Sequence, residues 1–542
     1  MSLPALDVPP NESATTESRV RWRFSESHLP LVVAAIAVAA GLYAVDTLPI
    51  GGFYDDAFYV ILGKSLATGH GYRNLNLPGA PFATHYPPGY PLLLAALWRI
   101  GPSFPSNLVL FKVANALFLG VVAAFAYKLA RERLALSIGF AVAATVAGTA
   151  TTPTLYLSSM LLSEMMFLAL VLPFLLWAER RVNEDRPDPR GALWLGVGAG
   201  LLFLVRSQAI ALVGAVALVY AIRRRWRESA LTVAAATIVV LPWLLWVSAH
   251  DAFPPLMRGD YGSYFAWFED GIRDGGPGIV LETLRRNLPD MFGHIAHRFR
   301  PPTNPLPDVI ASICVLLFAI PGVARLSRRA PVTLGFIAGY LAIVAIWPFA
   351  PVRFLLGIWV LIMLVLALGA QTLLESRLPT VAWNRPKMRL AMRLAGGIAA
   401  FVLVAGLIGY NVRGYQRRWW ATTEDLSGRW IAPKLEWIRS QTDTSAVIAT
   451  DHDEGVVYLY TGRHAVPITT FTAAEYLEPR SLDVDANALR TLTAHFGAQY
   501  LVLSSVRLRP TAAAISTTGV ALGDGEHRVV PWAFTLSRRR SR

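Results

Sequence analysis

Long apolar segments separated by short polar stretches dominate the chain from residue 30 to residue 410. A helix that crosses the ~30 Å hydrocarbon core of a bilayer needs roughly 20 mostly apolar residues. Eleven segments come close to that length: 30–50, 107–129, 134–150, 163–179, 191–205, 207–222, 230–249, 307–325, 331–348, 352–374 and 392–410. The pattern predicts an α-helical membrane domain over residues 30–410 with about eleven spans, and the two segments beside Arg206 can also be interpreted as one long helix.

Two polar segments interrupt the apolar pattern, at residues 51–106 and 250–306. The first contains a short amphipathic helix that ends at Gly69-His70-Gly71, and an apolar helix near 92–100 that is too short to span and is expected along the membrane face. The second is polar and aromatic, and its aromatic content argues against disorder. A loop of that length is usually functional or disordered, so we expect the second segment to be functional.

The composition becomes mixed and polar over residues 411–542. Short runs typical of β-strands lie at Ala446–Ala449, Val456–Tyr460, Ala465–Thr469 and Gln499–Ser504, with a helical stretch near 484–496. This part of the sequence contains no Gly-rich phosphate loop and no nucleophile elbow. We predict a small α/β domain outside the membrane.

Composition and charge place the chain in a membrane. The sequence is 54% hydrophobic and only 16% charged, and its mean hydropathy is +0.43, which excludes an ordinary water-soluble protein. The net charge of +14 comes largely from Lys and Arg residues in every second loop, and such loops stay on the cytoplasmic side. We therefore expect a multi-pass protein of the plasma (inner) membrane, with residues 1–29 in the cytoplasm and the C-terminal domain outside. Nucleic-acid binding is not needed to explain the charge.

Asp55 and Asp56 stand directly after the first apolar segment, on the expected outer side. A carboxylate at the hydrocarbon boundary loses hydration, so ionisable residues there are candidates for function. The alternative is that Asp55 caps the helix that follows it. Capping explains one aspartate better than two.

Three further charged residues are expected at the same outer face. Glu164 begins the fourth span, and Arg206 and Arg353 are each the only charge in a short outer turn. Carboxylates and guanidiniums at one membrane face suit a substrate with a phosphate at the lipid surface and a hydroxyl to be deprotonated. Glu164 could instead cap its helix, and the arginines could reach lipid headgroups.

Histidine residues raise the question of a metal. His85, His294 and His297 lie in the polar segments 51–106 and 250–306, called the first and second outer segments below. Their spacing fits no specific metal-binding template. Two or three carboxylates with a histidine could still hold a divalent ion. The sequence does not require one, so the metal stays a hypothesis beside ordinary polar histidines.

The order of these motifs resembles the GT-C glycosyltransferases, in particular bacterial members of the protein O-mannosyltransferase and aminoarabinose transferase superfamily. The resemblance rests on the following motifs: Asp55-Asp56-x-x-Tyr59, Gly69-His70-Gly71-Tyr72, Pro87-Pro88-Gly89-Tyr90-Pro91-Leu92, Ser163-Glu164, Arg206, Arg353-Phe354-Leu355-Leu356 and Tyr458-Leu459-Tyr460-Thr461-Gly462-Arg463. It covers most of the membrane part and a piece of the C-terminal segment.

The resemblance implies a membrane enzyme that takes a sugar from a polyprenyl-phosphate carrier. The sugar would pass, with inversion, to a hydroxyl of a lipid, glycan or protein acceptor outside the cytoplasm. Asp55 would be the general base, supported by Asp56 and Glu164. The rival interpretation is a transporter or flippase of lipid-linked sugars, which would more often show polar groups near the bilayer midplane.

One departure from the family pattern concerns the phosphate. Some members carry a lysine just before the Pro-Pro pair, where this chain has His85 and Tyr86. Contact with the phosphate would then shift to Arg206, Arg353 or His85. Tyr59 and Tyr86 are expected in the same substrate site.

Overall fold

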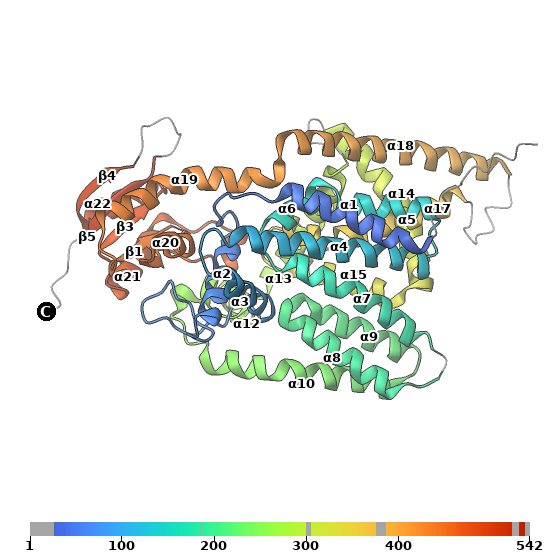
Figure 1. Cartoon of the computed structure of the whole chain (residues 1–542), viewed down its shortest axis with the longest axis horizontal. Coiled ribbons are helices and arrows are strands. Elements are labelled where there is room, and N and C mark those ends of the chain that lie inside the picture. Colours follow the sequence, from blue (N-terminus) through green and yellow to red (C-terminus); the bar gives the residue numbers. More distant parts are fainter. Residues whose placement is uncertain are drawn as a thin grey trace, which may run out of the picture.

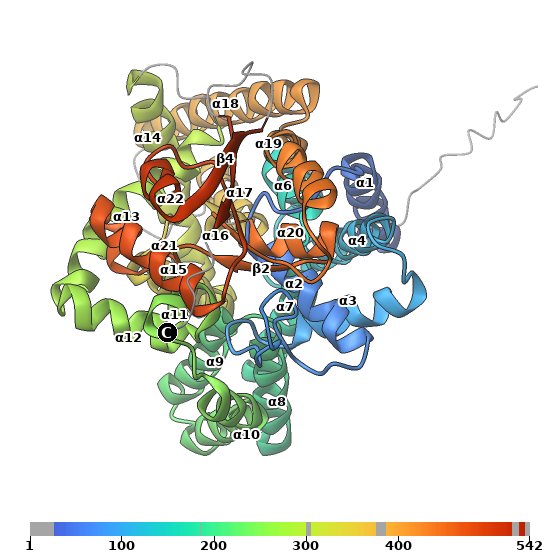
Figure 2. The ribbon, with the colours of Figure 1, turned by 90° about the vertical axis from the view of Figure 1, so that its left-hand side faces the viewer.

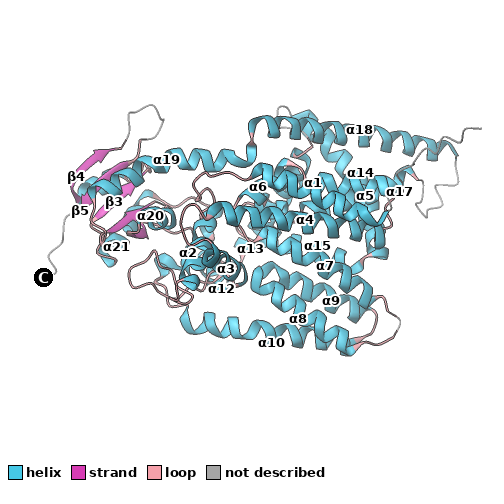
Figure 3. Ribbon diagram, viewed as in Figure 1, coloured by secondary structure: helices cyan, strands magenta, loops and turns pink. Residues whose placement is uncertain are grey.

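The computed structural model describes residues 26–184, 186–299, 305–375, 386–451, 453–522 and 530–536. Most of these residues form one elongated bundle of helices, and a small sheet lies beyond one end of it (Figure 1). All strands of the described residues lie in that sheet, while the described parts of the bundle and of the segments between bundle and sheet are helical or irregular (Figure 3). The prediction of a helical protein with a small C-terminal α/β domain is confirmed.

The bundle helices coincide with the predicted apolar segments. They are α1 (Leu29–Ala44), α4 (Leu108–Glu132), α5 (Ile138–Thr149), α7 (Glu164–Val182), α8 (Pro189–Val205), α9 (Ile210–Ile222), α10 (Trp226–His250), α14 (Pro305–Arg329), α15 (Pro331–Ile346), α17 (Trp359–Leu374) and α18 (Pro386–Arg417). The interpretation of the segments beside Arg206 as one helix is wrong. Arg206 has an extended backbone (φ −155°, ψ 124°) that ends α8, and the short helix η2 (Ser207–Ala209) leads into α9.

The number of membrane spans stays a prediction. By length and composition, five of the described helices can cross a membrane, or six if α5 and α6 (Thr152–Ser159), which bend by 46° at their break, form one span. Others, such as α8, α15 and α17, are apolar but only 10–17 residues long. Helix α3 (Gly89–Ile100) also belongs to this shorter group, and its place along the membrane face stays a prediction.

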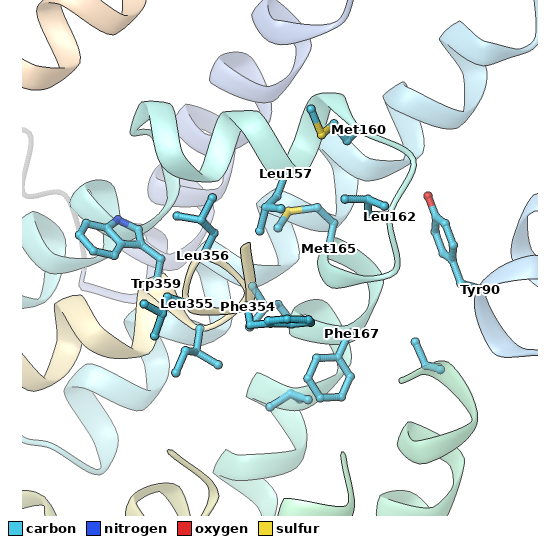
Figure 4. Packing of buried hydrophobic residues seen from close by; sticks show 14 of the residues in the cluster. Tyr90, Leu157, Met160, Leu162, Met165, Phe167, Phe354, Leu355, Leu356 and Trp359 are labelled. Atoms are coloured by element: carbon cyan, nitrogen blue, oxygen red, sulfur yellow. The ribbon is translucent and has the colours of Figure 1, made fainter. Parts of the chain in front are cut away.

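Small residues allow the bundle helices to approach closely. A Cβ atom on Gly196 would lie 2.3 Å from the carbonyl oxygen of Thr232, so only glycine fits where α8 crosses α10. At the end of the bundle nearest the sheet, Met165 and Phe167 of α7 and Leu355 of α16 (Val352–Leu356) are at most 3% exposed and belong to one apolar core (Figure 4). This packing fixes the backbone from which Glu164 and Arg353 project.

Helices of the two outer segments fill the space between bundle and sheet (Figure 1). Residues 51–106 contain α2 (Asp55–Ala67) and α3. The second outer segment is helical over most of its length, with η3 (Pro255–Met257), α11 (Arg258–Tyr261), α12 (Tyr264–Gly275) and α13 (Gly278–His297).

The C-terminal domain is built on a five-stranded sheet of order β2-β1-β3-β5-β4. Its elements are α19 (Trp419–Gln441), β1 (Val447–Thr450), α20 (Glu454–Thr461), β2 (His464–Pro467), η5 (Ala474–Tyr476), α21 (Leu482–His495), β3 (Tyr500–Leu503), α22 (Arg509–Ile515), β4 (Ser516–Ala521) and β5 (Trp532–Leu536). Strand β1 pairs in parallel with β2 and β3, and β5 pairs antiparallel with β3 and β4. Strands β4 and β5 were not predicted.

The prediction of a strand at Val456–Tyr460 is wrong, because these residues form α20. Their β-branched and aromatic side chains favour a strand locally. Gly462, in the left-handed conformation (φ 76°), ends the helix and donates its backbone N–H to the carbonyl of Tyr458. Burial of Val456, Val457 and Leu459 in the folded protein stabilises the helix over the strand.

Candidate functional site

A cavity of about 380 Å³ lies where the bundle, the two outer segments and the C-terminal domain meet. One part of its wall is polar, with Asp55, His85, Tyr86, Arg206 and Arg353. Another part is aromatic, with Tyr264, Trp267, Phe268, Trp347, Phe349 and Phe471. The cavity therefore offers charged groups beside a surface on which an apolar or sugar ligand can pack.

Asp55 begins α2 and points into this cavity. Both oxygens of its carboxylate are engaged by side chains: Tyr86 donates its hydroxyl to Oδ1 at 2.8 Å, and Arg353 donates Nη2 to Oδ2 at 2.5 Å. Burial alone would raise the pKa of Asp55, but Arg353 and the hydrogen bonds from Tyr86 and Arg353 together hold the pKa below its ordinary value. Asp55 is thus ionised near neutral pH and held by two partners that a ligand can displace.

Asp56 is fully buried and is not among the residues that line the cavity. Its Oδ2 accepts a hydrogen bond from the backbone N–H of Gly51 at 2.9 Å. Its Oδ1 accepts one from the backbone N–H of Ala57 at 2.8 Å. Burial raises the pKa of Asp56, and the two backbone donors oppose that rise. The two adjacent aspartates therefore have different surroundings, and Asp56 is the one that binds backbone amides at the start of α2.

Glu164 lies behind the cavity wall, 1% exposed, between two arginines. Its Oε2 is 3.0 Å from Nη1 of Arg206, and its Oε1 is 3.5 Å from Nε of Arg353. Arg206 also donates to the hydroxyl of Ser163 at 2.9 Å, and that hydroxyl lies 3.1 Å from the hydroxyl of Tyr59. Asp55, Arg353, Glu164 and Arg206 form a continuous chain of alternating charge.

His85 closes another side of the cavity. Its Nδ1 donates to the carbonyl of Gly262 at 2.6 Å, and its ring packs against Tyr86 and Tyr264, with centroids 4.6 and 4.4 Å away. Burial lowers the pKa of His85, so the ring is neutral at pH 7. A neutral His85 can hydrogen-bond a ligand but adds no positive charge.

Six of the eight residues expected in the catalytic and substrate site line this one cavity: Asp55, Tyr59, His85, Tyr86, Arg206 and Arg353. Glu164 contacts two of them, and Asp56 holds the backbone beside them. His294 and His297 lie on α13, outside the cavity wall. Within the described ranges, no group of three His, Cys, Asp or Glu residues is placed to hold a metal ion.

The sequence did not place the aromatic part of the wall. Segment 250–306 was noted for its aromatic residues, which include Tyr264 and Trp267, but nothing indicated that they face Asp55. The ring of Trp347 lies 4.7 Å from that of Trp267 and 5.8 Å from that of Tyr264, measured between centroids. Phe471 enters from the C-terminal domain, and no sequence signal marks it.

No protein-family model matches the chain, and no curated protein matches it in sequence. The fold is similar to the crystal structure of ArnT from Cupriavidus metallidurans bound to undecaprenyl phosphate, with a TM-score of 0.53 and 15% sequence identity over 94% of this chain and 98% of that chain. The apo state of the same protein gives a TM-score of 0.53 and 14% identity over 93% and 98% of the two chains. The similarity extends over the bundle, the outer segments and the C-terminal domain together. The chain thus has the fold of ArnT over nearly its whole length, and it is a multi-pass membrane protein.

Proposed function

We propose that this chain is a membrane glycosyltransferase that moves a sugar from a polyprenyl-phosphate-linked donor to an acceptor hydroxyl on the outer side of the membrane, with inversion. One observation carries the proposal. Asp55 and Arg353 lie 298 positions apart in the sequence, yet their side chains meet at 2.5 Å in the wall of one cavity. A base and a phosphate-binding cation side by side are what this transfer needs. The similarly folded ArnT binds undecaprenyl phosphate, which supports the same class of donor here.

Arg206 and Arg353 are the groups that we assign to the donor phosphate. Their side chains are 6% and 13% exposed, and in such surroundings a guanidinium binds a phosphate more strongly than it does in water. Both arginines are paired with carboxylates in the ligand-free protein, so the phosphate must compete for them. Glu164 contacts both guanidiniums and keeps them at the cavity wall.

Donor binding would also activate Asp55. When Arg353 turns toward the phosphate, Asp55 loses its nearest positive charge and keeps the hydrogen bond from Tyr86. Removal of a neighbouring cation raises the pKa of a buried carboxylate, so Asp55 becomes a stronger base once the donor is in place. An empty site would then hold a weak base, which suits an enzyme that must not act before its donor arrives.

In the transfer step, the acceptor oxygen attacks the anomeric carbon from the face opposite the phosphate. The acceptor proton moves to Asp55, the bond between the anomeric carbon and the phosphate oxygen breaks, and the bonding electrons leave with the polyprenyl phosphate. Arg206 and Arg353 stabilise the charge that develops on that phosphate. A single displacement with one base inverts the configuration. Asp56 takes no proton and positions Asp55 through the backbone amides of Gly51 and Ala57.

The aromatic wall is the part that we assign to the sugar and the acceptor. The ring of Trp347 packs against those of Trp267 and Tyr264, with centroids 4.7 and 5.8 Å away, so the three rings present apolar faces next to the charged groups. Sugar rings carry apolar C–H faces that such aromatic surfaces can cover, while Tyr59 and His85 supply polar contacts.

Purified protein mixed with a panel of undecaprenyl-phosphate sugars and an outer-envelope extract as acceptor tests this function. Mass spectrometry should show free undecaprenyl phosphate together with an acceptor that has gained one sugar. A flippase would move the lipid-linked sugar between leaflets and leave it intact. Intact donors throughout the panel, in protein that is folded and binds undecaprenyl phosphate, would contradict the transferase.

A further inference from the structure

Helix α20 of the C-terminal domain packs directly against the start of α2, the helix that begins at Asp55 (Figure 2). A Cβ atom on Gly455 would lie 3.1 Å from the Cβ of Ala57 and 3.2 Å from the ring of Phe58, so glycine permits the close approach. The hydroxyl of Tyr460 accepts the backbone N–H of Ile50 at 3.3 Å. The C-terminal domain therefore contacts the backbone of Ile50, before Asp55, and the side chains of Ala57 and Phe58, after it.

Glu454, the first residue of α20, gathers contacts from both outer segments. It is fully buried, and its Oε1 accepts the hydroxyl of Tyr54 at 2.5 Å and that of Tyr261 at 3.1 Å. Asn76 donates to the Tyr261 hydroxyl at 2.8 Å. One carboxylate oxygen of the C-terminal domain thus ties the first outer segment to the second at a point one residue before Asp55.

Tyr54 has a backbone conformation that few side-chain-bearing residues adopt, with φ 36° and ψ −60°. Such a conformation persists only where the surroundings hold it. The hydroxyl of Tyr54 is held by Glu454, and its ring packs on Phe58 with centroids 4.6 Å apart. Because Tyr54 directly precedes Asp55, its dihedral angles set the direction in which the Asp55 side chain leaves the backbone.

We propose that Glu454 is a positioning residue for Asp55, so that the C-terminal domain completes the catalytic site. Glu454 holds Tyr54 in its unusual conformation, and Tyr54 in turn directs the Asp55 carboxylate toward Arg353 and the acceptor. The proposal rests on the proposed function for the role of Asp55. It accounts for a buried acidic residue that lies outside the cavity lining.

Two substitutions at Glu454 separate this role from general packing. Glu454→Leu keeps the volume and removes the acceptor, whereas Glu454→Gln keeps an oxygen that can accept both tyrosine hydroxyls. We expect kcat to fall about 10- to 100-fold in the Leu variant, with the donor KM within about twofold of wild type, because misplacement of a reacting group by ~1 Å has effects of this size. The Gln variant should stay within about threefold of wild type. Tyr54→Phe removes the hydrogen bond between Tyr54 and Glu454 but leaves that of Tyr261, so kcat should fall within the same range, and the double variant should be no slower than Glu454→Leu.

Hydrogen–deuterium exchange of residues 51–58 provides a readout that does not depend on activity. Exchange there should be faster in Glu454→Leu and Tyr54→Phe than in wild type. Tyr458→Phe, on the same helix, keeps the ring contact with Lys64 and should change neither exchange nor kcat. Unchanged exchange in folded Tyr54→Phe and Glu454→Leu overturns the positioning role, whether or not a donor is known. Absence of transfer by the wild-type protein would contradict the proposed function alone.

Discussion

Replacement of Arg353 by Gln tests whether this guanidinium serves both the donor phosphate and Asp55. Arg353 contacts Asp55 at 2.5 Å and Glu164 at 3.5 Å and is only 13% exposed. Loss of one charge-assisted hydrogen bond to the phosphate corresponds to about 1.5–3 kcal/mol. At about 1.4 kcal/mol for each tenfold change, the efficiency of donor use should fall roughly 10- to 150-fold. Arg429→Gln, at an exposed arginine of α19, is the matched control.

The pH profile of the same variant carries a second expectation. The pKa of Asp55 is held below its ordinary value of 3.8, so the pair with Arg353 stabilises the folded protein above that value, and the contribution is lost as the pH falls through the lowered pKa. Without Arg353, burial of Asp55 has no cation to oppose it, and the pKa of Asp55 rises. The acidic limb of the rate profile should therefore move to higher pH in Arg353→Gln. Donor efficiency equal to wild type, with the acidic limb in the same place, would refute the reasoning.

Two further predictions concern stability and topology. Lys112 is fully buried between Asp46 at 2.7 Å and Glu424 at 3.0 Å, so Lys112→Met leaves two buried carboxylates without this cation. The substitution should lower the free energy of unfolding by about 3–5 kcal/mol. Thermal unfolding in detergent measures this, with Lys128→Met as the control, and equal transition temperatures of Lys112→Met and wild type would contradict it. Cysteines at Ser137 and Thr461, in a variant without Cys314, should differ in labelling by an impermeant reagent added outside, with only the Thr461 position reactive, and equal labelling would overturn the predicted orientation.

The sequence predicted the helical part of the fold well, because the apolar segments of a membrane protein are long and their limits are marked by charged residues. The sequence-based prediction failed where a single backbone position determines whether a segment is one helix, two helices or a strand. The extended backbone at Arg206 separates α8 from α9, and Gly462 with the burial of Val456 and Val457 makes α20 a helix. Neither effect is visible in local hydrophobicity.

The candidate site could be predicted as a set of residues, and the family resemblance already named Asp55 rather than Asp56 as the base. The contacts that distinguish the two aspartates could not be predicted, because only the fold shows that the amides of Gly51 and Ala57 bind Asp56 while Arg353 binds Asp55. Glu454 was missed because its partners, Tyr54 and Tyr261, lie 400 and 193 positions away. Contacts over such separations depend on the packing of whole domains, which no short motif records.

The turnover of Asp55→Asn tests the central claim most directly. Asn keeps the size of the side chain and can still accept the hydrogen bond from Tyr86, but it cannot take a proton from the acceptor. Purified Asp55→Asn protein should be folded, should bind undecaprenyl phosphate, and should transfer sugar about 10²- to 10⁴-fold more slowly than wild type. The exposed control Asp425→Asn should transfer at the wild-type rate. Sugar transfer by Asp55→Asn at a rate near that of wild type would contradict the account.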